Sequence, residues 1–250
     1  MTKHEHIVSS YEEELQSLNN KIAKMGGVAE ELLGHSIDAL EHRDPLLAER
    51  TIGDDKQVDE LEREVEELAI TMIARRQPMA LDLRQIMAAI RISSDLERIG
   101  DLGKNIAKRA LAVAEEDQPK RLVLGLKHIG EIALEQLKDV LDAYIERDAD
   151  KALRVWYRDE EIDAMYNSIF RELLTYMMED PRNIGFCTHL LFGAKNIERI
   201  GDHATNIAET IYYLVHGTPI PDERPKGDVT STMPADMTHA AKSKPRKKSK

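Results

Sequence analysis

The sequence predicts an all-α protein built from two tandem antiparallel three-helix bundles, with six long helices. Apolar residues recur three or four positions apart over long stretches, as in Leu61, Val65, Leu68 and Met72, and this is the spacing of one buried helix face. Aromatic residues make up 4% of the 250 residues and charged residues 32%, a composition that favours helices over a β-sandwich. An internal repeat divides the helices into two equivalent groups.

Prolines and helix-capping aspartates mark the expected helix ends, because proline cannot continue a helix and aspartate caps the next one. In chain order the breaks fall at 43–45, 77–78, 117–119, 147–148, 180–181 and 217–219. They leave six segments of roughly 30 residues, each about 45 Å long at ~1.5 Å per residue. Because the connections are short, consecutive helices are expected to pack antiparallel.

The internal repeat is carried by two pairs of segments. The first pair is ALEHRDPLLAERTIGDDKQVDELE from Ala39 and AYIERDADKALRVWYRDEEIDAMY from Ala143, which align without gaps at a shift of 104 residues. The second pair is DLERIGDLGKNIAKR from Asp95 and NIERIGDHATNIAET from Asn196, at a shift of 101 residues. Helix periodicity alone would not repeat ERIGD followed by NIA, so the pattern indicates a duplication.

The repeat sets the expected domain organisation. Residues 1–117 form the first three-helix unit and residues 118–217 form the second. Residues 218–250 are rich in Pro, Gly, Ser, Thr and Lys, a composition that cannot bury enough apolar area to offset the entropy of ordering. The sequence therefore predicts a disordered basic tail over 218–250.

Charge and cysteine content exclude several classes of function. The 46 acidic residues outnumber the 35 basic ones, for a net charge of −11, and the basic residues of 242–250 lie in the predicted tail. A body this acidic is not expected to bind nucleic acid directly, because phosphate contacts need clustered cations. The single cysteine, Cys187, and the lack of an apolar signal stretch or spanning segment predict a cytoplasmic protein.

Ten oxygen-bearing side chains recur at matched positions of the two copies. Steps of four residues place each set along one helix face. Adjacent carboxylates on one face repel each other, so a cation is expected to offset them. Carboxylate and amide oxygens are ligands for hard divalent or iron-type cations. The candidate metal ligands are Asp55, Asp59, Glu97, Asp101 and Asn105 in the first copy and Asp159, Asp163, Glu198, Asp202 and Asn206 in the second.

A second interpretation of these residues is a solvated polar face. With 100° per residue, Glu97 and Asp101 lie nearly opposite the apolar position Ile99, and spacing alone favours this interpretation. Lys104 and Lys108 lie on the same side and could supply the counter-charge. Against it stand the recurrence of identical acids and the small residues beside them, Gly100 and Gly201, which would let a neighbouring helix approach.

The chain resembles the PhoU family of bacterial phosphate-signalling regulators over residues 7–217. The motifs that carry the resemblance are MGGVAEELL at Met25, ARRQPMALDLR at Ala74, LERIGD at Leu96, LTYMMEDPR at Leu174 and NIERIGDHATNIAETIYYLVHG at Asn196. The basic tail after Lys242 is not part of the shared pattern.

The resemblance implies two tandem three-helix bundles, metal clusters bound on the bundle surface by E/DxxxD motifs, a homodimer in many members and no catalytic activity. The family motif falls on Asp55, Asp59, Glu97 and Asp101 and on Asp159, Asp163, Glu198 and Asp202. The implied partners are a PstB-like transporter ATPase and a PhoR-like sensor histidine kinase, held in its signalling-off state when phosphate is ample. Membrane contact would then be peripheral and through these partners.

Enzymatic alternatives lack their motifs. A ferritin-like di-iron site needs Glu-x-x-His pairs that point into the bundle, and none of the nine histidines has glutamate three residues before it. No HExxH, GxxxxGK or GxGxxG pattern is present. His203 has no counterpart in the first copy, where Leu102 stands, and is expected to pack rather than to bind metal. A metal-storage or metal-delivery bundle remains as the alternative to a signalling adaptor.

Overall fold

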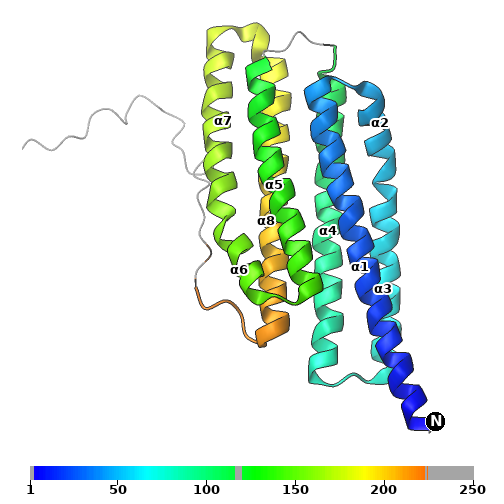
Figure 1. The fold of residues 1–250 in the computed structure, drawn as a ribbon. Coiled ribbons are helices and arrows are strands. Elements are labelled where there is room, and N and C mark those ends of the chain that lie inside the picture. Colours follow the sequence, from blue (N-terminus) through cyan, green and yellow to red (C-terminus); the bar gives the residue numbers. More distant parts are fainter. Residues whose placement is uncertain (1–2, 116–119, 223, 225–250) are drawn as a thin grey trace, which may run out of the picture.

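The computed structural model describes residues 3–115, 120–222 and 224, and these are helical with no strand (Figure 1). The helices are α1 (Lys3–His42), α2 (Pro45–Asp54), α3 (Lys56–Arg76), α4 (Ala80–Ala112), α5 (Lys120–Glu146), α6 (Ala149–Tyr157), α7 (Asp159–Glu179), the 3₁₀ helix η1 (Pro181–Asn183) and α8 (Ile184–His216). The all-α prediction is confirmed. No helix among these residues has the length and hydropathy needed to cross a bilayer.

Two of the expected long helices are bent rods made of two helices each. The segment expected at 45–77 consists of α2 and α3, which separate at Asp55, and the segment expected at 148–180 consists of α6 and α7, which separate at Arg158. Both break residues keep right-handed helical dihedral angles. The breaks are therefore bends within a rod, and the six-rod architecture holds.

The expected helix starts after Asp44 and Asp148 are present and have the same construction. Asp44 Oδ1 accepts hydrogen bonds from the backbone N–H groups of Leu46 and Leu47, both at 3.0 Å. Asp148 Oδ1 accepts one from the backbone N–H of Lys151 at 2.9 Å. The residue before each cap, Arg43 or Arg147, has a left-handed backbone with φ of 55° or 54°. The repeat is thus visible in the backbone as well as in the sequence.

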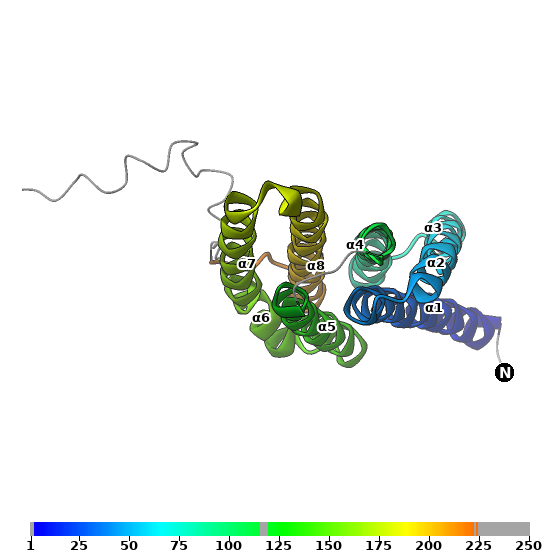
Figure 2. The ribbon, with the colours of Figure 1, turned by 90° about the horizontal axis from the view of Figure 1, so that it is seen from above.

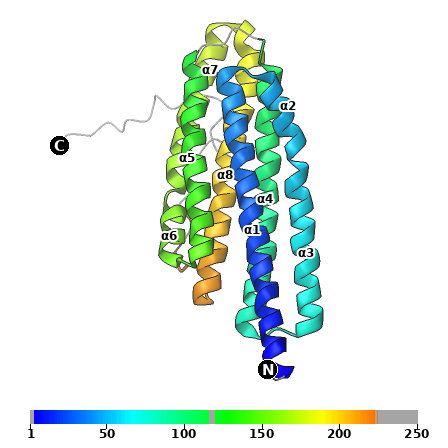
Figure 3. The same cartoon turned by 45° about the vertical axis from the view of Figure 1, so that its right-hand side comes forward.

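The helices form two side-by-side groups, α1–α4 and α5–α8, with α4 and α8 adjacent at the centre (Figure 2). Contacts of α4 with α8 and of α1 with α5 join the groups. The turns between α3 and α4 and between α7 and α8, which are equivalent in the repeat, lie at opposite ends of the molecule (Figures 1 and 3). The proposed boundary between residues 117 and 118 lies outside the described residues and stays a prediction.

Buried apolar side chains form one core that runs through both groups. In α4 the fully buried positions include Leu96 and Ile99, and in α8 they include Ile197 and Ile200. Leu96 and Ile197 directly precede the ERIGD motifs, and Ile99 and Ile200 lie within them. The motif of each copy therefore lies on a helix that is held in the core. Of the predicted tail, residues 218–222 and 224 are described and contact the second group, where composition predicted disorder. The basic residues of 242–250 lie outside the described part of the chain.

Replacing Asp44 by Ala is expected to lower the free energy of unfolding by about 1 kcal/mol, because two backbone N–H groups at the start of α2 lose their acceptor. Asp148→Ala should have a similar effect on α6. Chemical denaturation measures both. Asp44→Asn is the control, since its side-chain oxygen can still accept; an equal loss with Asn would contradict the capping role.

Candidate functional site

The first carboxylate cluster forms where the bend between α2 and α3 meets α4. Asp55 lies at the bend and is only 3% exposed. Lys104 Nζ on α4 donates to Asp55 Oδ2 and to Asp101 Oδ1, each at 2.5 Å. Gly100 allows this approach, because a Cβ there would lie 3.4 Å from Asp55 Oδ1 and 3.3 Å from Val58 Cγ2. Two helices thus bring two carboxylates onto one cation.

Burial and mutual repulsion govern ionisation in this cluster. Burial raises the pKa of Asp55, although the hydrogen bond from Lys104 acts in the opposite direction. Burial acts to lower the pKa of Lys104, but its hydrogen bonds to Asp101 and Asp55 outweigh burial and raise it. The pKa of Glu97 is raised by burial and then by the charge of Asp101, with smaller effects from Asp59 and Asp55. One ammonium therefore serves several interacting acids.

The contacts of Lys104 go to Asp55 and Asp101, and Glu97 is paired with a different cation. Its Oε2 is buried without a hydrogen-bond partner and lies 3.3 Å from Nε of the exposed Arg98. Oxygen atoms buried without a donor are costly. The positive charge that faces Glu97 is that of Arg98, whose own side chain is 57% exposed.

The second carboxylate cluster occupies the equivalent place between α7 and α8. Asp159, which begins α7, is also 3% exposed. Arg224 Nε lies 3.0 Å from Asp159 Oδ2, and its Nη2 lies 3.2 Å from Asp159 Oδ1 and 2.5 Å from Asp202 Oδ1. The Thr205 hydroxyl donates to Asp159 Oδ1 at 3.1 Å. Gly201 again faces the neighbouring helix, here at Ile162.

The expectation of a solvated polar face is wrong for four of the ten predicted residues. Asp55, Asp159, Asp163 and Glu198 are buried. The helical wheel placed Glu97 and Asp101 opposite the apolar stripe, and the same exposure was inferred for the other acids. A wheel considers one helix alone and does not include burial by a neighbouring helix. The remaining six are partly exposed: Asp59, Glu97, Asp101, Asn105, Asp202 and Asn206.

Two of the predicted residues on α8, Glu198 and Asn206, contact side chains outside the second cluster. Glu198 Oε1 accepts a hydrogen bond from Lys195 Nζ at 2.8 Å. Asn206 Nδ2 donates to Asp95 Oδ1 on α4 at 3.3 Å, and His203 Nδ1 lies 2.8 Å from the same oxygen. Asp95 and His203 thus join α8 to α4. Sequence reasoning did not predict the role of Asp95.

Arg224 was also missed, because it lies in the segment predicted to be a tail. A signal was present in the repeat: Lys104 aligns with Thr205, so the second copy lacks the lysine that neutralises the first. A buried aspartate in the second copy then requires a cation from elsewhere.

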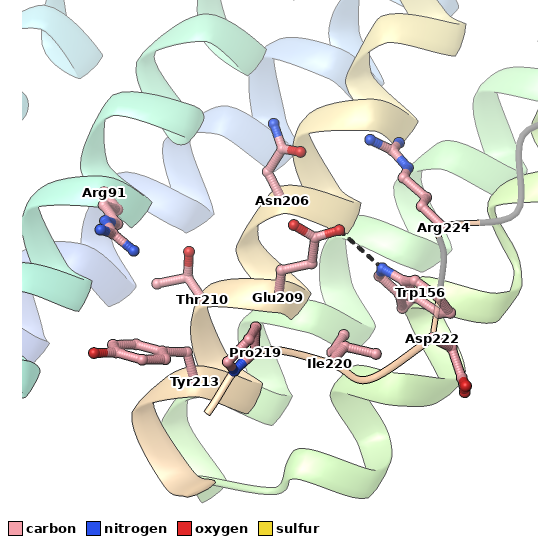
Figure 4. Close-up of a pocket in the computed structure, with 10 residues that line it drawn as sticks. All are labelled: Arg91, Trp156, Asn206, Glu209, Thr210, Tyr213, Pro219, Ile220, Asp222 and Arg224. Atoms are coloured by element: carbon pink, nitrogen blue, oxygen red, sulfur yellow. Dashed lines mark hydrogen bonds between the residues drawn. The ribbon is translucent and has the colours of Figure 1, made fainter. Parts of the chain in front are cut away.

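A cavity of about 580 Å³ adjoins the second cluster (Figure 4). Trp156, Glu209 and Tyr213 line it, together with Ile220 and Arg224 of the segment after α8. The Trp156 indole N–H donates to Glu209 Oε1 at 2.9 Å, as the dashed line in Figure 4 marks. The segment after α8 therefore forms one wall of the cavity and also supplies the cation of the cluster.

The ten predicted ligands do not close around a single point. Among the described residues, one set of three acidic or imidazole side chains has ligand atoms within 4.8 Å of one another, and it is Asp38, Glu41 and His42 at the end of α1. Glu41 there is paired with Lys127 at 2.9 Å. In the two predicted clusters, the nitrogen atoms of Lys104 and Arg224 lie among the oxygens instead.

These features define an internally duplicated helical-bundle protein with a cation-neutralised carboxylate cluster in each copy. A family model described as the PhoU domain matches residues 22–110 and 126–211, one match in each copy. The chain belongs to the PhoU family, as the resemblance predicted.

Relatives and solved structures agree with this assignment. The chain is 60% identical over 230 residues to the phosphate-specific transport system accessory protein PhoU homolog of Rhizobium meliloti, covering 92% of this chain and 97% of the relative. The homolog of Caulobacter vibrioides is 52% identical over 227 residues, covering 91% and 99%. The crystal structure of PhoU from Pseudomonas aeruginosa superposes with a TM-score of 0.81 at 39% identity, covering 83% of this chain and all of that one.

Replacing Lys104 by Thr, the residue of the second copy, is expected to lower the free energy of unfolding by about 1–3 kcal/mol, since Asp55 loses a charged hydrogen bond. The loss of unfolding free energy should be larger at higher pH. Without Lys104 the already raised pKa of Asp55 rises further, so stability present below its ordinary pKa is lost as pH rises through the raised value.

Thermal unfolding of the Lys104→Thr variant and the parent at pH 4 and pH 7, with chelator, measures this difference. Lys108→Thr, an exposed position on the same helix, is the matched control. A deficit that is equal at both pH values would contradict the assigned role of Asp55.

Proposed function

We propose that this protein is a non-enzymatic accessory regulator of phosphate transport. It relays the state of a PstB-like transporter ATPase to a PhoR-like sensor kinase in the cytoplasm, acts as a homodimer, and represses phosphate-starvation signalling when phosphate is ample. The observation that carries the proposal is the match of the PhoU domain to both copies, together with relatives that are named accessory proteins of the phosphate-specific transport system.

Exposed apolar side chains at helix ends support a binding role. Met79 and Leu81, at the turn between α3 and α4, are 80% and 66% exposed, and Met178, near the end of α7, is 81% exposed. Contiguous exposed apolar patches, rather than single side chains, mark interaction sites, and Met79 and Leu81 lie near each other at one turn. Because equivalent turns lie at opposite ends of the molecule (Figure 1), two partners can bind at the same time. A relay requires that one partner's state changes the affinity for the other.

We also propose that each carboxylate cluster holds a divalent or iron-type cation in the functional protein. The donor set fits, because a cationic nitrogen already lies among aspartate oxygens from two elements in each cluster. Asp55, Asp59, Glu97 and Asp101 would hold it in the first copy, and Asp159, Asp163, Glu198 and Asp202 in the second. A bound cation supplies positive charge that offsets carboxylate repulsion and fixes the helix pair.

Deleting the gene is expected to switch on phosphate-starvation genes in medium rich in phosphate, because the kinase is no longer held off. Reporter expression measures this. A pull-down of the purified chain with the transporter ATPase and with the cytoplasmic part of the kinase, at high and low phosphate, tests the contacts directly. Unchanged expression together with no capture of either partner would contradict the regulator role.

Asp101→Ala and Asp202→Ala are each expected to lower the number of bound cations per chain and to remove the rise in melting temperature that cation addition produces in the parent. Metal analysis and thermal unfolding after chelator treatment measure both effects. Asp54→Ala, at a partly exposed aspartate beside the first cluster, is the control. Uptake of many cations per chain would instead support a storage protein.

A further inference from the structure

The two copies neutralise equivalent aspartates with cations of different origin. In the first copy the cation is Lys104, in the middle of α4. In the second copy Thr205 occupies the position of Lys104, and the cation is Arg224. Arg224 lies after the last helix and beyond residue 211, where the second match to the PhoU domain ends. The second cluster is therefore closed by a separate piece of chain.

That piece, called here the C-terminal segment, comprises residues 218–222 and Arg224. Three contacts attach it to the second group of helices. Tyr157 donates a hydrogen bond from its hydroxyl to Asp222 at 2.8 Å, Ile220 packs partly buried against the core, and Arg224 pairs with Asp159 and Asp202 at 17% side-chain exposure. Of the two polar contacts, the Arg224 pair is the more buried, since Tyr157 is 54% exposed.

We propose that Arg224 is an internal ligand that competes with a divalent cation for Asp159 and Asp202, so that cation binding at the second cluster releases the C-terminal segment. The first cluster lacks this coupling, since Lys104 cannot leave α4. This inference rests on the cation-binding part of the proposed function and concerns only its second copy.

Competition follows from the shared oxygen atoms. The guanidinium contacts both oxygens of Asp159 and one of Asp202, so a metal ion ligated by these oxygens has to displace it. Asp159 is buried, and a buried carboxylate without a positive partner is strongly destabilising. Either the Arg224 guanidinium or the metal ion can be the positive partner of Asp159. Release of Arg224 is inexpensive because the freed guanidinium returns to water, where it is well solvated.

The chain carries its own reporter of this release. Trp156 is the single tryptophan, is 1% exposed and lines the cavity whose wall includes Ile220, Asp222 and Arg224 (Figure 4). The adjacent Tyr157 holds Asp222. Departure of the C-terminal segment would admit water beside the indole and shift its fluorescence emission to longer wavelength.

The test is a Mn²⁺ titration of the full chain in two matched pairs. The first pair carries Asp101→Ala, which disables the first cluster, and compares the protein that also carries Arg224→Gln with the protein that keeps Arg224. The second pair carries Asp202→Ala, which disables the second cluster, and compares the protein that also carries Lys104→Gln with the protein that keeps Lys104. Bound Mn²⁺ is measured by electron paramagnetic resonance, and the wavelength of the Trp156 emission maximum by fluorescence. Arg224→Lys retains a positive charge and should behave between Gln and Arg.

We expect Arg224→Gln to raise the Mn²⁺ affinity of the second cluster by about tenfold, a typical coupling between competing ligands. With Arg224 present, Mn²⁺ should shift the Trp156 emission to longer wavelength. With Arg224→Gln, the emission should already be shifted before Mn²⁺ is added. Lys104→Gln should alter Mn²⁺ binding at the first cluster while leaving the emission maximum unchanged.

Two outcomes overturn the inference: equal Mn²⁺ affinity with and without Arg224, or saturation of the second cluster with no shift in emission. In either case the measured Mn²⁺ binding would still support the proposed cation sites. Absence of Mn²⁺ binding in all variants would overturn this inference and the cation part of the proposed function together. The regulator role would then be decided separately by the pull-down.

Discussion

The burial of one aspartate at a helix bend, in each copy, is the constraint on which the site depends. Asp55 and Asp159 are 3% exposed, and an ionised carboxylate at such depth requires a positive partner. The partner must reach it from a neighbouring element, and Gly100 and Gly201 leave room for the close packing that makes this possible. Helix approach, carboxylate burial and the need for a cation are therefore parts of one arrangement.

Duplication places this arrangement twice in one molecule. The helices that carry the ERIGD motifs, α4 and α8, are in contact with each other and, with α1 and α5, join the two groups. Asp95 of α4 contacts His203 and Asn206 of α8. A change at either cluster thus acts on a helix that belongs to the central interface. This connection would give a physical basis for the coupling that the proposed relay requires.

The fold could be predicted from the sequence because the signals that mark helices are local. Apolar periodicity, Asp44 and Asp148 as caps, and the prolines mark helices without knowledge of their neighbours. The bends at Asp55 and Arg158 escaped it because these residues keep helical dihedral angles. Burial of the acids and the partner of Asp159 depend on packing between helices, which periodicity does not contain. Lys104 was anticipated as a counter-charge, together with Lys108, because both lie on the same helix as Asp101, whereas Arg224 comes from a distant segment.

The most direct test of the account is a double-mutant cycle on Asp55 and Lys104, with the free energy of unfolding measured for the parent, Asp55→Ala, Lys104→Ala and the double variant at pH 7 in the presence of chelator. The account predicts a coupling energy of about 1–3 kcal/mol, because removing Lys104 is more harmful while Asp55 remains buried and charged. Additive losses would show that the two side chains do not depend on each other, and would contradict the central role assigned to the buried aspartate.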